Sequence, residues 1–169
     1  ANDAMQFTQD IAKSKALLAE AGIAENSLSL TVTYTAGSPE PQKAAEIYKA
    51  ALANIGVELT LQPMSWEAQY ELATSNPDVA QDIFMMFWWP TYVTSQDFLA
   101  SLFRSEDSVN YNLSYYKNPA FDELVDAGSA TMATDAASAT AAFEDASRLL
   151  AADAPAVFMY DQKNTYGIS

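Results

Sequence analysis

The sequence predicts an α/β fold with a mixed, mostly parallel sheet flanked by helices. Segments with an apolar residue every three or four positions alternate with short segments of alternating or unbroken apolar residues, an order typical of βαβ units. Glycine or proline separates most of these segments, as expected at the ends of elements. Half of the 169 residues are hydrophobic, which is enough for one sizeable core. We expect residues 1–169 to form a single α/β domain.

The first predicted element is a helix over residues 7–21. Ile11 and Leu18 share its apolar face at helical spacing. Thr8 is the predicted N-cap, and Gly22 follows the last turn where a C′ glycine is favoured.

A βαβ unit is predicted next. Residues 28–34 and 57–62 alternate apolar and polar side chains, as strands do, and between them Ser38 and Pro39 begin a helix that Gly56 ends. We expect the two strands to be parallel, with a right-handed crossover. The predicted inner face of the helix consists of Ala44, Ile47, Tyr48, Ala51, Leu52 and Ile55.

Residues 82–92 hold an unbroken apolar run between Asp82 and Pro90. The run is too short for a membrane span and too continuous for a half-exposed strand, so it predicts a strand that is buried on both faces in the middle of the sheet. A short helix capped by Ser65 and a turn at Asn76 and Pro77 precede this strand.

The sequence pattern of the C-terminal half predicts three helices and a fourth strand. The helices begin near Ser95, at Asn118 and Pro119, and at Thr134 or Asp135. Pro155 ends the last helix, residues 156–160 have the composition of a strand, and residues 161–164 can form a turn before a short segment that ends at Ile168. Residues 104–117 form a loop rich in Asn, Ser and Tyr, which suits either ligand contact or packing over a sheet edge.

The predicted strand ends carry the candidate ligand-binding residues. In open α/β sheets ligands bind beyond the carboxyl ends of the strands, which here are residues 34–37, 64–66 and 88–92. An alternative is that the tryptophans only fill the core. The candidate ligand-binding residues are Trp66, Trp88, Trp89, Thr91, Tyr92, Tyr34 and Tyr111.

Composition excludes several classes of function. The chain has no Cys and no His, so thiolate and imidazole metal sites, thiol nucleophiles and a histidine base are all excluded, and we expect no metal and no cofactor. The formal charge of -14 argues against nucleic acid and anionic membranes as partners, and its scattered distribution favours solubility over cation binding. Nucleotide-binding and EF-hand motifs are absent from the sequence.

Two groups of carboxylates are candidates for a catalytic site, one at Asp122, Glu123 and Asp126 and one at Glu144 and Asp145. Both have helical spacing beside a phenylalanine, which is typical of the solvated faces of amphipathic helices. Glycosidase chemistry needs two carboxylates that face each other across a cleft. We therefore expect no enzyme, and a carboxylate-dependent hydrolase of oligosaccharides stays as the alternative.

An ordered set of segments spans nearly the whole chain. The segments are residues 15–22, 45–47, 52–59, Trp88, 97–99, Asn112, Tyr116, 118–119, 121–124, 154–157 and Tyr160. In order and spacing they resemble the family 5 extracellular solute-binding proteins, the peptide and nickel receptors of ABC importers.

The resemblance implies a class II periplasmic-binding-protein-like lobe, excised from the C-terminal lobe region of a larger two-lobed protein. No stretch is typical of a signal peptide or a membrane span, so the chain is either a cytosolic protein or a processed or excised piece of a larger one, and the resemblance implies the second. Such a receptor binds an oligopeptide or a similarly extended solute between its two lobes, outside the cytoplasm, in the periplasm or as a lipoprotein on the outer face of the membrane. Its partners are the ligand, the second lobe and the membrane permease.

Two departures from the family pattern bear on the ligand. Thr91 stands where dipeptide-binding members resemble one another in having an Asp for the ligand's ammonium, and residues 35–39 contain no Arg for its carboxylate. A buried terminal charge without a partner costs several kcal/mol, which argues against short zwitterionic peptides. Longer peptides, oligosaccharides stacked on Trp88 and Trp89, and a sensor or regulator that contains the same lobe remain open.

Overall fold

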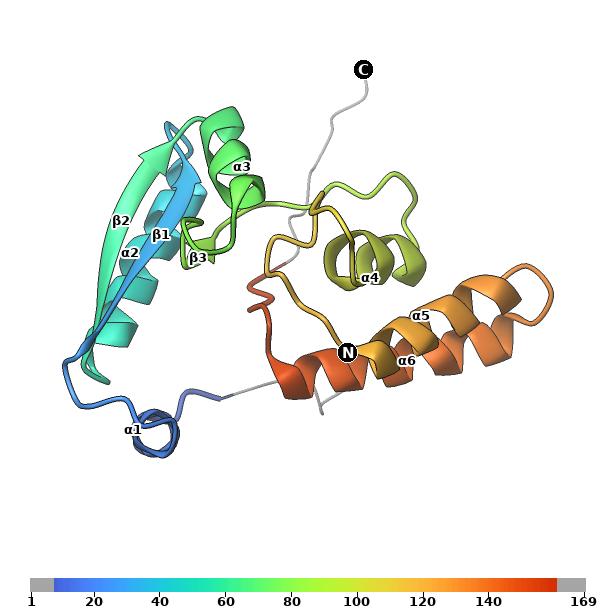
Figure 1. The fold of residues 1–169 in the computed structure, drawn as a ribbon, viewed down its shortest axis with the longest axis horizontal. Coiled ribbons are helices and arrows are strands. Elements are labelled where there is room, and N and C mark those ends of the chain that lie inside the picture. The colour runs from blue at the N-terminus through green and yellow to red at the C-terminus, as the bar shows by residue number, and fades with distance from the viewer. Residues whose placement is uncertain (1–7, 161–169) are drawn as a thin grey trace, which may run out of the picture.

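The computed structural model describes residues 8–160 (Figure 1). Its elements in chain order are α1 Ile11–Glu20, β1 Leu28–Thr35, α2 Pro39–Ala53, β2 Val57–Met64, α3 Trp66–Ser75, β3 Ile83–Phe84, α4 Ser95–Phe103, α5 Pro119–Thr131 and α6 Ala136–Asp153. None of the helices in this part of the chain is long and apolar enough to cross a membrane.

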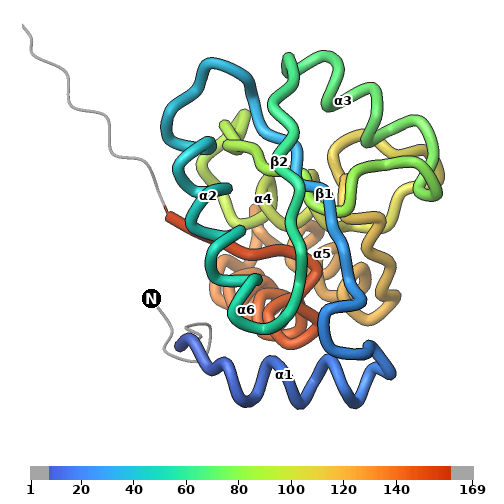
Figure 2. The backbone as a smooth tube through the Cα atoms, turned by 90° about the vertical axis from the view of Figure 1, so that its left-hand side faces the viewer, coloured from blue at the N-terminus to red at the C-terminus, as the bar shows by residue number. Residues whose placement is uncertain are grey.

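The predicted βαβ unit is confirmed. β1 and β2 pair in parallel over eight residues, from Leu28 opposite Val57 to Thr35 opposite Met64. Figure 2 shows the two strands between α2 on one side and α3 on the other. The α2 side of the sheet is apolar because alternate residues of β1 point there. Its buried core consists of Val32, Tyr34, Ala45, Leu59 and Met85.

The second part of the molecule is helical. α5 and α6 lie side by side, joined by a short loop, and α4 packs against them (Figure 1). Their apolar faces form a separate core, centred on the fully buried Phe121 and Val125. This core explains the helical spacing of apolar residues in the C-terminal half of the sequence.

Local capping signals fixed most helix starts. Ser65, Asn118 and Asp135 accept hydrogen bonds from backbone N–H groups of α3, α5 and α6, as predicted. The prediction of Thr8 as the cap of the first helix is wrong. Asp10 is the N-cap, because its carboxylate accepts a hydrogen bond from the N–H of Lys13 at 2.9 Å.

The prediction of a strand in the middle of the sheet, in the apolar run between Asp82 and the loop at 88–92, is wrong in its position and its length. β3 is only Ile83–Phe84 and lies at the edge of the sheet, in the order β2-β1-β3, parallel to β1. After Phe84 the chain makes one more sheet bond, from the N–H of Met85 to the carbonyl of Thr33 at 3.0 Å, and then leaves the sheet. Met86 and Trp88 pack against the helical core instead. The apolar run is continuous because it crosses from one core to the other.

Two further expectations differ from the structure. Residues 156–160 form no strand, and residues 157–160 are exposed. Ile47, predicted on the inner face of α2, is 62% exposed, and Ala45 is buried in its place. The predicted turn at 161–164 and the segment ending at Ile168 lie outside the described residues.

Candidate ligand-binding pocket

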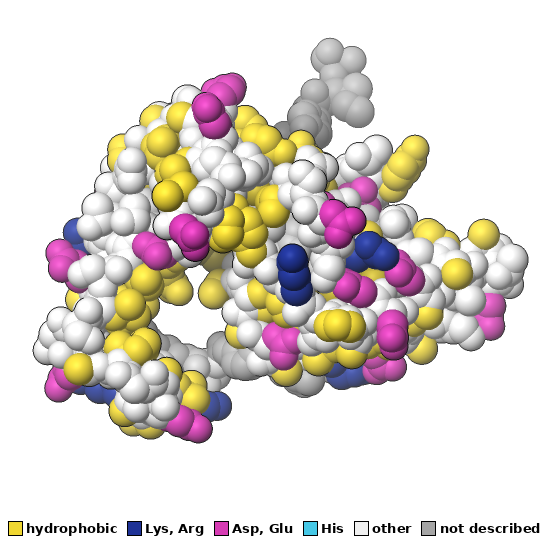
Figure 3. All heavy atoms as spheres, viewed as in Figure 1, with side chains coloured by type: hydrophobic (Ala, Val, Ile, Leu, Met, Phe, Trp, Pro, Cys, Tyr) yellow, Lys and Arg dark blue, Asp and Glu magenta, His cyan; other side chains and the backbone are white. Residues whose placement is uncertain are grey.

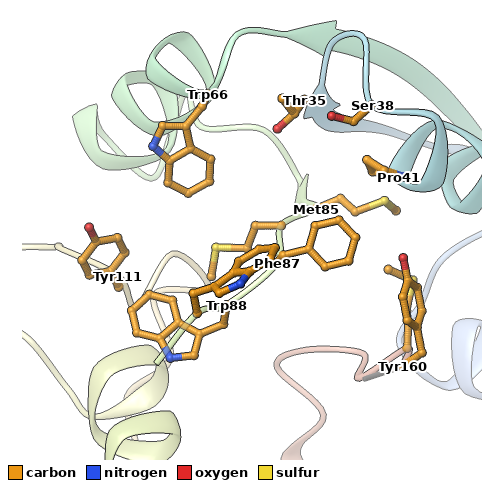
Figure 4. Close-up of a pocket in the computed structure, with 12 residues that line it drawn as sticks. Thr35, Ser38, Pro41, Trp66, Met85, Phe87, Trp88, Tyr111 and Tyr160 are labelled. Atoms are coloured by element: carbon orange, nitrogen blue, oxygen red, sulfur yellow. The ribbon is translucent and has the colours of Figure 1, made fainter. Parts of the chain in front are cut away.

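A pocket of about 360 Å³ lies where the sheet and the helical part meet (Figure 4). It is bounded by the end of β1, the first turns of α2 and α3, the segment after β3, the loop before α5 and the chain that follows α6. Its lining residues are Thr35, Ser38, Pro41, Trp66, Met85, Met86, Phe87, Trp88, Trp89, Tyr111, Met159 and Tyr160.

Trp88 is held in place from two directions. Its indole N–H donates a hydrogen bond to Oδ2 of Asp97 at 3.3 Å, and Asp97 is a buried residue in the first turn of α4. The ring of Tyr111 meets the indole edge to face, with centroids 5.0 Å apart. Since the N–H is engaged within the protein, Trp88 offers its ring rather than a hydrogen bond to the pocket.

A chain of aromatic contacts continues from Tyr111 into α3. Tyr111 lies 5.7 Å from Tyr70, Tyr70 stacks on Trp66 at 6.0 Å, and Trp66 meets the edge of Phe84 at 5.6 Å. The Tyr70 hydroxyl donates to Oδ1 of Asn110 at 2.9 Å. Burial, aided by the neighbouring Tyr111 and Glu106, raises the pKa of Tyr70, so this hydroxyl stays neutral. These contacts fix one wall of the pocket.

The opposite wall is formed by the segment after β3 and the chain after α6. Phe87 makes edge-to-face contacts with Trp89 at 5.5 Å and with Tyr160 at 5.9 Å. Trp89 is 66% exposed, so most of its ring is open to a ligand at the mouth of the pocket.

The chemistry of the pocket is neutral. None of its twelve lining residues in the described part of the chain carries a charge, and their polar side-chain groups are two hydroxyls, two phenols and three indole N–H groups, of which that of Trp88 is bonded to Asp97. Within residues 8–160, His, Cys, Asp and Glu side chains form no cluster of three that could hold a metal ion. The pocket can therefore stack flat groups, cover apolar ones and form a few hydrogen bonds.

The acidic residues lie elsewhere. Figure 3 shows Asp and Glu side chains spread over one face of the molecule, on the sheet side and the helical side alike. In the second carboxylate group, Glu144 and Asp145 pair with Arg148 on the exposed side of α6. In the first, Asp126 pairs with Arg104 at 2.8 Å and Asp122 accepts from the N–H of Ser105, so both carboxylates hold the loop after α4.

The predicted site residues separate into three groups. Trp66, Trp88, Trp89 and Tyr111 come together in the pocket. Thr91 and Tyr92 are exposed outside its lining, Tyr92 by 71%. Tyr34 lies in the sheet core, because the alternation of β1 turns it toward α2.

Several lining residues carry no signal in the sequence that identifies them as part of a site. Thr35 is part of the predicted strand end at residues 34–37. It could not be singled out because the sequence does not show which side of β1 faces the pocket. Phe87 and the two methionines were assigned to the interior of a strand, so their role in the pocket could not be recognised. Met159 and Tyr160 lay in a predicted fourth strand. No short-range signal indicates that this segment passes the pocket.

An α/β lobe with a pocket beyond its strand ends is the arrangement in which open α/β proteins bind small solutes. The chain belongs to the bacterial extracellular solute-binding proteins, family 5, whose middle-region profile matches residues 1–110. This confirms the resemblance found in the sequence. Members of this family bind substrates for transport.

Individual relatives support the assignment. Heme-binding protein A of Haemophilus influenzae is 30% identical over 128 residues, which cover 73% of this chain and 23% of that protein. The periplasmic binding protein DppA of Helicobacter pylori, in complex with the peptide STSA, has a TM-score of 0.73 at 25% identity, over 86% of this chain and 28% of that one. The Escherichia coli murein tripeptide binding protein MppA has a TM-score of 0.74 at 27% identity, and the match covers 89% of this chain and 28% of that one.

These structures confirm the predicted periplasmic-binding-protein-like α/β fold. The chain spans about a quarter of the length of these relatives.

Proposed function

We propose that this chain is one lobe of the substrate-binding component of an ABC importer, and that it holds an oligopeptide or a similarly extended solute against a second lobe. The observation that carries the proposal is the neutral aromatic pocket at the strand ends. The peptide complex of the DppA relative and the tripeptide-binding relative support this ligand class. The protein would act outside the cytoplasm, in the periplasm or lipid-anchored on the outer face of the membrane, with a membrane permease as its partner.

The proposal gives a role to six of the seven candidate residues, all but Tyr34, which lies in the sheet core. Trp66, Trp88 and Tyr111 form the fixed aromatic wall, and Trp89 covers the ligand at the mouth. Thr91 and Tyr92 would touch only a ligand that extends beyond the pocket.

The described residues bring no charge to the lining, which favours the interior of a longer peptide over a free terminus. An ammonium or carboxylate placed here would lose its water without gaining a partner, at a cost of several kcal/mol. A peptide interior presents neutral amides and side chains, which suit hydroxyls and aromatic rings. An oligosaccharide stacked on the open ring of Trp89 is the second candidate, because that ring is largely exposed.

A titration of the full-length protein that contains this lobe tests the proposal. Tryptophan emission is followed while a pool of tetra- to octapeptides, a pool of oligosaccharides and haem are added separately; haem is included because of the name of the Haemophilus influenzae relative. We expect saturable binding of the peptide pool, with the peptides recovered intact by mass analysis. Binding of sugars or haem alone would contradict the ligand class, and cleavage of the ligand would favour a hydrolase.

A further inference from the structure

We propose that Thr35 and Ser38 form a hydrogen-bond donor subsite in this pocket for a neutral carbonyl oxygen, as in a peptide bond, and that Gln69 is a positioning residue that orients the Thr35 hydroxyl. The inference rests on the proposed function and specifies which part of the ligand the pocket recognises. Figure 4 shows Thr35 and Ser38 next to each other on the side of the pocket opposite Trp88.

The Thr35 hydroxyl is oriented from behind the pocket. Gln69, on α3, is 0% exposed, and its Nε2–H donates to Oγ1 of Thr35 at 3.2 Å. A hydroxyl that accepts a hydrogen bond still has its own hydrogen to donate. Within residues 8–160 the Thr35 hydroxyl donates no hydrogen bond of its own. Because Thr35 lines the pocket, the hydrogen is available to a ligand acceptor there.

The Ser38 hydroxyl is available for a different reason. Ser38 is the N-cap of α2, where a serine normally accepts a hydrogen bond from the N–H two or three positions later. The third position is Pro41, which has no N–H, and the Ser38 side chain makes no capping bond. Ser65, the N-cap of α3, does accept such a bond from Ala68 at 3.2 Å. Because Pro41 has no N–H and the capping bond is absent, the Ser38 side chain is not held in the capping geometry, and its hydroxyl can turn to donate into the pocket that it lines.

Gln69 is poorly explained by stability alone. Its Oε1 is buried and has no donor among the described residues. An apolar side chain of similar size would avoid this unpaired acceptor, although it would also lose the bond to Thr35. What glutamine provides, and an apolar residue would not, is the donor that fixes Thr35.

The chemistry of the subsite selects a neutral acceptor. Two hydroxyl hydrogens lie at the edge of an otherwise aromatic and sulfur-containing surface, to which residues 8–160 contribute no positive charge. A carboxylate would keep most of its desolvation penalty at such a site, whereas an amide carbonyl needs only one or two neutral donors. The adjacent aromatic rings can cover the residue that carries this carbonyl.

The test uses the full-length protein and peptides of five to eight residues with acetylated N-termini and amidated C-termini. We expect Thr35→Val and Ser38→Ala each to weaken binding about three- to tenfold, the range for one neutral hydrogen bond. Thr35→Ser, which keeps the hydroxyl, retains binding. Thr33→Val is the matched control: Thr33 lies on the same side of β1 and is fully buried, yet it is outside the pocket lining, so its affinity stays at the wild-type value.

The role of Gln69 is tested by a double-mutant cycle with Gln69→Leu. We expect Gln69→Leu to weaken binding when Thr35 is present and to have no further effect on binding in the Thr35→Val background. An equal loss of affinity in both backgrounds would show a merely structural effect and overturn the positioning role. Normal affinity of Thr35→Val in a protein that binds peptides would overturn the subsite alone. Failure of the wild type to bind any peptide would overturn the subsite and the proposed function together.

Discussion

The hydrogen bond between Trp88 and Asp97 fixes the central ring of the pocket, and its removal has a calculable cost. Asp97→Ala leaves the half-buried indole N–H without an acceptor, and a bond to a charged group is worth about 1.5–3 kcal/mol. The distance of 3.3 Å places it at the lower end of that range. The carboxylate also lies in the first turn of α4, where an acidic residue contributes about 0.3–1 kcal/mol. We expect Asp97→Ala to lower the free energy of unfolding by about 2 kcal/mol.

For a chain of this length, that loss lowers the melting temperature by roughly 4–8 °C. The measurement is urea unfolding followed by circular dichroism, with Trp emission recorded in the native state, which should shift to the red as the indole gains water. Asp97→Asn keeps an acceptor for the indole N–H, so its free energy of unfolding should fall by about half as much as that of Asp97→Ala. Glu123→Ala, at an exposed position on α5, is the control. A change below about 0.5 kcal/mol in Asp97→Ala would refute the anchoring of Trp88.

Two further predictions concern the helical part. Gly128→Ala should destabilise the protein by about 1 kcal/mol net in urea unfolding, because the new Cβ would lie 2.6 Å from Phe143 Cε1 and overpacking outweighs the gain in helix propensity. Neutral or increased stability would contradict this close approach. Burial and the bond to Asp153 raise the pKa of Tyr116 to about 12, so its stabilising effect is complete below pH 10 and is lost between pH 10 and 12. Between pH 10 and pH 12 the free energy of unfolding of the wild type should therefore fall by about 1–2 kcal/mol more than that of Tyr116→Phe. An equal fall in both proteins would contradict the raised pKa of Tyr116.

Elements with local signals were predicted well. Alternating side chains in residues 28–34 and 57–62, with a capped helix between them, specify a parallel pair because a short crossover leaves few other arrangements. Helix starts at Ser65, Asn118 and Asp135 were correct for the same reason, since a cap depends on a side chain and a backbone group only two or three residues apart.

Features that depend on distant contacts were not predicted. The run after Asp82 has the composition of a buried strand, but its burial comes from two different cores, and composition does not distinguish these cases. The placement of Tyr34 required knowing which side of β1 faces α2. Residues 156–160 are apolar enough for a strand, yet they have no ladder partner in the described part of the chain.

The candidate site was predicted in part because strand ends of a parallel sheet share one edge. Trp66 and Trp88 follow β2 and β3, so the order of elements alone brings them together. The hydroxyl subsite could not be foreseen, since it depends on a bond between Gln69 and Thr35, 34 positions apart. A side-chain hydrogen bond between residues so far apart in the sequence can be recognised only once the fold is known.

The claim that the aromatic pocket is the ligand-binding surface is tested most directly by calorimetric titration of the capped peptides into two variants of the full-length protein. Trp88→Ala removes a ring at the centre of the pocket, whereas Tyr92→Ala removes a largely exposed ring outside its lining. We expect Trp88→Ala, checked for folding by circular dichroism, to lower the affinity by at least tenfold and Tyr92→Ala to change it less than threefold. Unchanged affinity in a folded Trp88→Ala variant would contradict the site.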